Sequence, residues 1–160
     1  MDAFILGLKK AIDRIVDAVA VSALSVLVLV VAAQVISRYV VGRPFTWSEE
    51  LARYMLVWIV YLFAVIAFRL SRHMGIDFFV LLLSDRFRGI VQGAGDVLIF
   101  GFLILVLRFG TELVGITLPQ TSAALGIPMG LVYLAFPVSA GLMALELLFR
   151  LYSRLTGGRR

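Results

Sequence analysis

Apolar residues fall into four long runs along this chain, and polar or charged residues separate the runs. They cover about residues 15–36, 51–68, 90–110 and 129–149. Each run approaches the roughly 20 residues that a helix needs to cross about 30 Å of hydrocarbon. Backbone groups in lipid must bond to one another, so we expect these runs to be helices. The pattern predicts an all-α integral membrane protein with four transmembrane helices, forming a single domain over residues 1–160.

A shorter apolar stretch, residues 76–83, lies between the second and third runs with charges on both sides. It is too short to span a bilayer, so we expect a short helix lying in the membrane interface. His73 precedes Asp77 by four residues, a spacing that would place both side chains on one face of such a helix. A metal site is not expected, because the chain has one histidine and no cysteine.

The polar residues that could specify a contact gather on both sides of the second run. An apolar segment of about 15 residues, Tyr54 to Phe68, separates the two groups. Because a helix rises about 1.5 Å per residue, the groups are expected near opposite faces of the membrane. The first group contains Arg38, Arg43, Trp47, Glu49, Glu50 and Arg53, and the second contains Arg69, His73 and Asp77. We take these residues, together with Asp96 of the third run, as candidates for a subunit interface or docking surface.

Residues 46–49 read T-W-S-E and match the S/T-x-x-E capping box, so a helix is expected to begin near Thr46. Arg53 follows Glu49 by four residues and Glu50 by three, which places all three on one helical face. Two interpretations stay open. The group is either a solvated ion pair at a capped helix start, or a cluster buried against a partner subunit.

Ionisable residues interrupt the third run. Asp96 lies one to two turns from its inner end, while Arg108 and Glu112 lie toward its outer end. Charged groups at membrane depth are costly and often functional. We favour snorkelling, pairing of Arg108 with Glu112, or packing against a partner over an ion pathway, because only Asp96 is expected clearly inside.

The fourth run contains a proline and a favourable ion pair. Pro137 removes one backbone donor and frees the Tyr133 carbonyl, so we expect a kink there. Glu146 and Arg150 follow at i,i+4 spacing near the inner end. The preceding segment, residues 117–130, contains two prolines and several small polar residues and indicates a compact connector.

Composition supports the same class. The chain is 62% hydrophobic and 16% charged, with a mean hydropathy of +1.04. Average soluble domains are about 45–50% apolar and about 25% charged, so a soluble globule is a poor fit. The formal charge of +5 does not indicate nucleic-acid binding, because the basic residues flank apolar runs instead of covering one polar face. No catalytic residue and no cofactor is expected.

Lys and Arg are distributed unevenly between the two predicted sides. With a cytoplasmic N-terminus, eleven lie inside: Lys9, Lys10, Arg14, Arg69, Arg72, Arg86, Arg88, Arg150, Arg154, Arg159 and Arg160. Four lie outside: Arg38, Arg43, Arg53 and Arg108. The positive-inside rule therefore predicts that both termini are cytoplasmic. The apolar stretch from Ala18 to Ile36 exceeds a typical signal-peptide core, which favours an uncleaved first span.

One arrangement of motifs resembles a known family. The order R-Y-x-x-G-x-P-x-x-W-x-E-E-L-A-R over residues 38–53, then R-x-x-x-H-x-x-x-D over residues 69–77, resembles the small membrane subunit of tripartite ATP-independent periplasmic (TRAP) transporters, the DctQ family. Residues 122–137, with L-G-I-P at 125–128, are also similar to that family. Asp96 has no place in this pattern.

The resemblance implies a heterodimer with a large membrane subunit in the bacterial inner membrane. That large subunit holds the substrate and sodium sites and moves by an elevator mechanism. A periplasmic substrate-binding protein delivers an organic acid, such as a C4-dicarboxylate or a sialic acid. The small subunit, which has no chemistry of its own, scaffolds the large one.

Two other functions remain as alternatives. A small self-dimerising four-helix carrier would need an acidic residue deep in the first span, where this chain offers only Gln34, with Asp17 at the edge. A structural accessory subunit of another membrane complex is the second alternative. A membrane enzyme or redox subunit is disfavoured, because such chemistry needs clustered acidic ligands or more histidines.

Overall fold

The computed structural model describes residues 2–42, 45–70 and 85–157, with side chains described for residues 7–42, 45–70 and 91–153. Its elements are α1 (Asp2–Ile36), a π-helical turn η1 (Ser37–Val41), α2 (Thr46–Leu70), α4 (Asp85–Thr117), α5 (Met129–Tyr133) and α6 (Ala135–Gly157). Four of the helical segments are long and apolar enough to cross a membrane: Gly7–Val41, Thr46–Leu70, Val91–Thr117 and Met129–Ser153. The predicted four-helix membrane fold is confirmed. The interfacial helix predicted over residues 76–83 lies outside the described residues.

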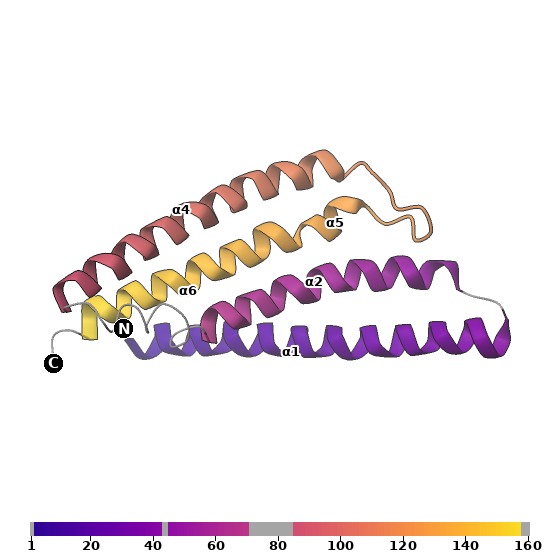
Figure 1. The fold of residues 1–160 in the computed structure, drawn as a ribbon, viewed down its shortest axis with the longest axis horizontal. Helices are drawn as coiled ribbons and strands as arrows, with labels where there is room; N and C mark the ends of the chain where they lie inside the picture. The colour runs from indigo at the N-terminus through magenta and orange to yellow at the C-terminus, as the bar shows by residue number, and fades with distance from the viewer. Residues whose placement is uncertain (1, 43–44, 71–84, 158–160) are drawn as a thin grey trace.

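The helices form a row in the order α1, α2, α6, α4 (Figure 1). Helix α1 runs antiparallel to α2, and α4 runs antiparallel to α5 and α6. The beginning of α1 and the end of α6 lie at the same end of the bundle. That arrangement is the one expected of four spans. Which side of the membrane this end faces stays a prediction, and we call it the inner end, and the opposite one the outer end, after the predicted topology.

Helix α1 and its π-helical turn are longer than a bilayer is thick. Together they contain 35 and 5 residues, or about 60 Å at 1.5 Å per residue, against about 30 Å of hydrocarbon. Gly42, in the left-handed conformation at φ 71°, ends the turn and donates its N–H to the Ser37 carbonyl. The helix is therefore long enough to extend beyond the hydrocarbon, where polar side chains can be placed.

One cluster of buried residues lies between α1 and α2 in the inner half of the bundle. Val16 and Ala20 of α1 pack against Leu62 and Val65 of α2, and Leu142 of α6 closes the cluster. Ala20 is fully buried, so its small side chain allows α1 to approach α2 closely.

The kink predicted at Pro137 is confirmed. The fourth span is interrupted at Leu134, between α5 and α6, one turn before the proline. Gly110 of α4 faces this break, and a Cβ atom there would lie 3.1 Å from the Pro137 Cδ. The bend and the glycine together bring α4 and α6 into close contact.

The third span is longer than predicted. Helix α4 continues past residue 110 to Thr117, because Arg108 and Glu112 lower the hydropathy without disfavouring helix. After it, the chain forms a compact hairpin-like connector, as expected. An isolated antiparallel bridge joins Thr121 to Pro128, and the Met129 N–H bonds to the Gln120 carbonyl at 2.7 Å.

Candidate functional site

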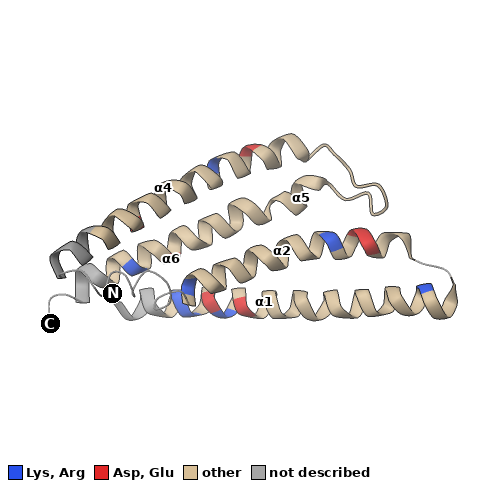
Figure 2. Cartoon of the chain, in the orientation of Figure 1, with Lys and Arg blue, Asp and Glu red and all other residues tan. Residues whose placement is uncertain are grey.

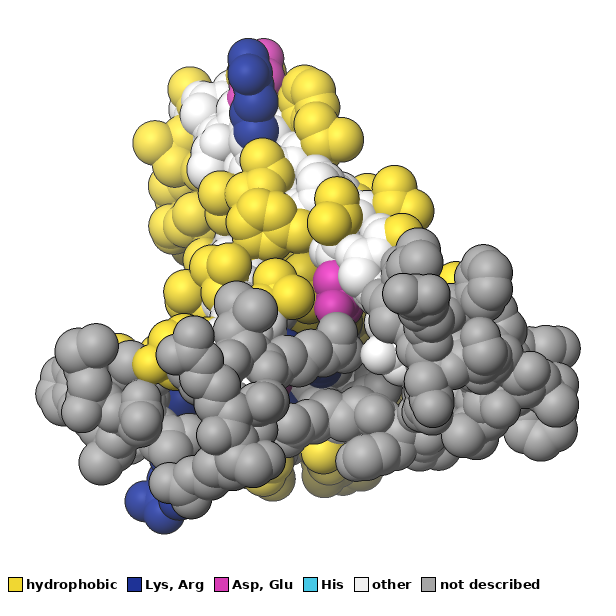
Figure 3. All heavy atoms as spheres, turned by 90° about the vertical axis from the view of Figure 1, so that its left-hand side faces the viewer, with side chains coloured by type: hydrophobic (Ala, Val, Ile, Leu, Met, Phe, Trp, Pro, Cys, Tyr) yellow, Lys and Arg dark blue, Asp and Glu magenta, His cyan; other side chains and the backbone are white. Residues whose placement is uncertain are grey.

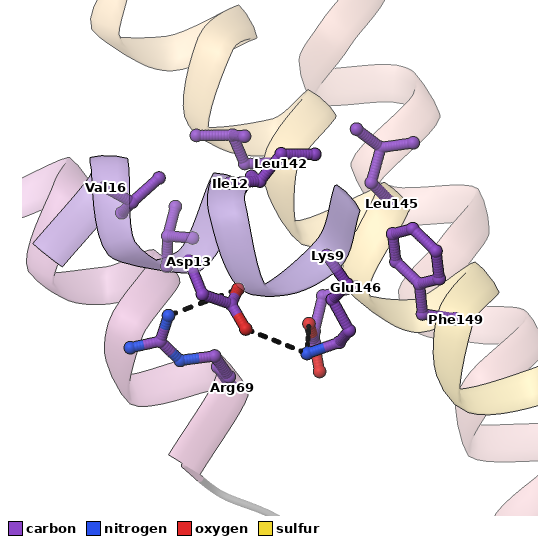
Figure 4. Close-up of a pocket in the computed structure, with 10 residues that line it drawn as sticks. Lys9, Ile12, Asp13, Val16, Arg69, Leu142, Leu145, Glu146 and Phe149 are labelled. Atoms are coloured by element: carbon purple, nitrogen blue, oxygen red, sulfur yellow. Dashed lines mark hydrogen bonds and ion pairs between the residues drawn. The ribbon is translucent and has the colours of Figure 1, made fainter. Parts of the chain in front are cut away.

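An ionic cluster ties three helices together at the inner end of the bundle (Figure 4). Lys9 of α1 lies 3.1 Å from Asp13 and 3.0 Å from Glu146 of α6. Arg69 of α2 lies 3.2 Å from Asp13 and 2.6 Å from Asp17. Glu146 is buried, with 8% of its side chain exposed, and Arg69 has 18% exposed. The cluster therefore joins the N-terminal helix pair to the C-terminal half of the chain.

Arg150 extends this inner cluster toward the backbone of α2. Its guanidinium lies 3.7 Å from Glu146, as the i,i+4 spacing predicted, and stands 4.7 Å from the Phe68 ring centre. It also donates to the Phe68 carbonyl, near the end of α2. The Arg150 Nε is buried without a hydrogen-bond partner in the described part of the chain.

The cavity beside the inner cluster is small. Its volume is about 20 Å³, and Lys9, Asp13, Arg69 and Glu146 supply its polar lining. About 10–15 Å³ of such space suffices for one water molecule, so an organic acid does not fit. We conclude that the cluster holds helices together and does not bind a substrate of that class.

A second polar group lies at the outer end, between α1 and α2. Glu49 of α2 pairs with Arg38 of the turn η1 and accepts a bond from the Gln34 side chain of α1 at 3.2 Å. Both Arg38 and Glu49 are about half exposed. Exposed pairs contribute little to stability, so this contact fixes the register of α1 against α2 more than it holds them together.

Glu50 holds the outer loop onto α2. Its carboxylate accepts the backbone N–H of Ala124 at 2.7 Å and of Leu125 at 2.9 Å. The Tyr54 hydroxyl, one turn along α2, also donates to it. A side chain of the second span thus anchors the connector before the fourth span. Sequence reasoning placed Glu50 in a shared cluster and missed this role, which depends on a residue separation above 70.

Arg53 shares a helical face with the two glutamates of α2, as predicted, but it pairs with neither. Within the described residues no ion pair joins Arg53 to Glu49 or Glu50, because one carboxylate bonds to α1 and the other to the outer loop. Arg53 and Trp47 are exposed at the outer end of α2. The helix does begin at Thr46 as predicted. In its first turn the Ser48 hydroxyl donates a hydrogen bond to the Phe45 carbonyl.

Contacts with α6 set the position of the charged residues of α4 along the fourth span. Gly141 is the central residue of the Met129–Ser153 span, and a Cβ atom there would lie 3.6 Å from a Leu107 methyl. Arg108 is therefore level with the middle of that span, while Glu112 lies about 6 Å and Asp96 about 18 Å from Arg108 along the helix, at about 1.5 Å per residue. The expectation that only Asp96 lies clearly inside the membrane stays a prediction.

Asp96 is half-buried on the face of α4 that meets α6. It precedes the buried Leu103 by seven residues, and Leu103 precedes Gly110 by seven, so the three share one face. Asp96 also has an interaction partner. Its position at the inner end, facing the bundle, explains how an acidic residue is tolerated in this span.

The remaining predicted candidates, Arg43, His73 and Asp77, lie outside the described residues. Of the described candidates, the structure brings together Arg38 with Glu49 at the outer end, and Arg69 with the inner cluster. The acidic partners of Arg69 were missed. The available signal was the spacing of Lys9, Asp13 and Asp17, four residues apart on one face of the first helix.

Comparison with known proteins identifies the family of this four-span chain. Residues 27–157 match the family described as "Tripartite ATP-independent periplasmic transporters, DctQ component". The chain is 24% identical over 149 residues to a putative TRAP transporter small permease protein of Haemophilus influenzae, covering 93% of this chain and 92% of the relative. It is 25% identical over 159 residues to the sialic acid TRAP transporter small permease protein SiaQ of Vibrio cholerae, covering 94% and 88%.

A longer relative contains a similar segment. The chain is 32% identical over 136 residues to the isethionate TRAP transporter permease protein DctMQ of Oleidesulfovibrio alaskensis, a match covering 80% of this chain. It spans only 21% of that relative's length. The family match covers most of the chain and agrees with its four membrane-spanning helices. The chain thus belongs to the DctQ family of small TRAP transporter permease subunits, and it is a multi-pass inner-membrane protein of a transport family, not of a catalytic one.

Proposed function

We propose that this chain is the scaffold that holds the large membrane subunit of a TRAP transporter during uptake of an organic acid. One observation carries the proposal. The same unit matches a small permease along 92% of its length and also matches about a fifth of a longer permease. A unit that occurs both alone and as a segment of a longer permease is expected to work in contact with the remainder of that permease.

The internal contacts of the chain support a scaffolding role. Its inner cluster joins α1, α2 and α6, and Glu50 joins the outer loop to α2. Charged groups that are paired inside a bundle stabilise one arrangement of its helices. A rigid small subunit would give the moving parts of a large subunit a fixed support in the membrane.

In this proposal the partner proteins, and not this chain, bind the substrate and the coupling ion. The named relatives transport sialic acid or isethionate, so an organic acid is the class we propose, with C4-dicarboxylates included. We propose sodium coupling through the large subunit and delivery by a periplasmic binding protein. Trp47 and Arg53, exposed at the outer end of α2, are candidates for docking on that side, together with Arg43. His73 and Asp77 are candidates for contacts on the inner side.

Native mass spectrometry of the co-expressed subunits tests the proposal. We expect a heterodimer with one copy of this 17.7 kDa chain per large subunit. The alternative function, a self-dimerising carrier, predicts a homodimer near twice that mass that takes up substrate in liposomes without any partner. Finding that homodimer active, with no large subunit bound, would contradict the scaffold function.

A further inference from the structure

The outer face of α4 is the face that points away from α6. Leu103 and Gly110 are buried against the bundle, whereas Leu98 is 75% exposed and Phe102 64% exposed on the other side. Only 6% of the most apolar stretch of this span is buried, against 39% for the span formed by α5 and α6. The outer face of α4 must therefore meet either lipid or another protein.

Arg108 and Glu112 stand on this outer face. Each is two residues from Gly110 and so lies about 200° around the helix from the buried face. Both are exposed, and neither has an ion pair or hydrogen bond from its side chain in the part of the chain that the structure describes. In Figure 2 one basic and one acidic position of α4, toward the end that leads to the outer loop, lie on the edge away from α6.

The surroundings of these charges are apolar. Figure 3 looks along the bundle and shows basic and acidic side chains at the edge formed by α4, with hydrophobic side chains beside them. Phe109, the neighbour of Arg108, is 60% exposed. Because Arg108 lies level with the middle of the fourth span and Glu112 about 6 Å from Arg108 along the helix, lipid on this face would surround both charges without supplying a partner.

Helix α1 provides the contrast. Its exposed residues include Val28 and Leu29, and its sequence between Asp17 and Arg38 contains no charged residue. Such a surface can face lipid without penalty. Of the two exposed helices at the ends of the row, α1 thus fits lipid, whereas α4 requires polar groups from outside the described chain.

Small residues on α4 would permit a close approach. Gly101 and Gly115 lie seven residues before and after Arg108, and therefore share its side of the helix. A Cβ atom added to either glycine would meet nothing within 4 Å. Small residues at membrane interfaces let two helix backbones pack closely, which also brings polar side chains of a neighbour within bonding reach of the charges.

We propose that the outer face of α4, centred on Arg108 and Glu112, is the surface on which a transmembrane helix of the large subunit packs. That helix presents an acceptor, carboxylate or carbonyl, to Arg108 and a hydrogen-bond donor to Glu112. The large subunit is the fitting occupant because a longer relative joins this unit to a larger permease chain. The inference rests on the proposed function and adds which face makes the contact and which charges it uses.

Association of the two purified subunits tests this surface. Arg108→Leu removes the charge and leaves the acceptor on the large subunit unpaired. Gly101→Leu blocks the close approach of the partner helix to α4. Each substitution should weaken the apparent association constant at least about tenfold. The matched control is Ala32→Leu, a small-to-large change at an exposed position of α1, which should leave association unchanged. The isolated Arg108→Leu chain should keep its helix content and thermal midpoint, so that weaker association reports the interface and not unfolding.

Photo-crosslinking identifies the occupant. A photoreactive residue at Leu105, on the outer face of α4, should form an adduct with the large subunit, and one at Leu29 of α1 should not. Crosslinks from Leu105 only to a second copy of this chain would overturn the proposal. So would wild-type association in both the Arg108→Leu and Gly101→Leu variants. If the wild-type chain itself does not associate with the large subunit, the proposed function is contradicted. That failure is distinguishable from failure of the proposed surface, because it is seen with the wild-type chain and needs no variant.

Discussion

Glu146 is the buried acidic residue of the inner cluster, and replacing it with glutamine removes its charge while nearly preserving its shape. In the wild-type chain this carboxylate lies 3.0 Å from Lys9 of α1 and 3.7 Å from Arg150 of its own helix. Glu146→Gln leaves two cations facing a neutral side chain. We expect the contact between α1 and α6 to weaken most, because that is where Glu146 reaches a separate helix.

The expected loss of stability follows from the contacts that remain. Removing one partner of a buried ion pair typically costs about 3–5 kcal/mol. Lys9 keeps Asp13 at 3.1 Å, and Arg150 keeps the Phe68 carbonyl and ring, so neither cation becomes isolated. We therefore expect a loss of about 2–3 kcal/mol, toward the value for a hydrogen bond to a charged group.

Unfolding in detergent or bicelles, followed by circular dichroism, measures this loss. A change of about 2–3 kcal/mol should lower the thermal midpoint of a chain of this size by roughly 4–12 °C. The matched control is Glu49→Gln, the same substitution in a pair whose carboxylate side chain is 53% exposed, where about 0–1 kcal/mol is expected. Equal effects of the two substitutions would refute the claim that the inner cluster holds the bundle together. A double-mutant cycle of Lys9→Met with Glu146→Gln should show coupling between the two residues.

Three further outcomes are expected. Glu50→Ala should speed hydrogen exchange at the backbone amides of Ala124 and Leu125, because the Glu50 carboxylate accepts their N–H groups. Exchange within the helices should be unchanged, and unaltered exchange in the loop would contradict the anchoring role. Gly130→Ala places a Cβ atom 2.8 Å from a methyl of Leu118, the residue that follows α4, and should destabilise by about 1–3 kcal/mol. Gly93→Ala, with nothing within 4 Å, should stabilise or be neutral, and a harmless Gly130→Ala would show that the end of α4 and α5 are farther apart. An impermeant thiol reagent added outside should label Gly42→Cys and not Ser71→Cys, and the opposite result would invert the predicted topology.

The sequence predicted the fold well because bilayer thickness imposes a length on every span. All four spans appear where apolar runs were found, and Pro137 interrupts the fourth as its missing N–H required. Boundaries were less predictable. Hydropathy ended the third span near residue 110, but the helix continues to Thr117 because helical hydrogen bonding does not stop where polarity begins.

The candidate site was predicted less completely, since its contacts join distant residues. Spacing along one helix correctly gave the pair of Glu146 with Arg150. It could not give the bond from Glu50 to the outer loop, nor the bridges from Arg69 to α1. Those contacts depend on which helices become neighbours.

Uptake by reconstituted liposomes with one component omitted at a time tests the central claim most directly. The complete system contains this chain, the large subunit and the binding protein with its labelled organic acid, under an inward sodium gradient. The scaffold function predicts uptake by the complete system, little uptake when this chain is omitted, and none from this chain alone. Full uptake by the large subunit and binding protein without this chain, or uptake by this chain alone, would contradict it.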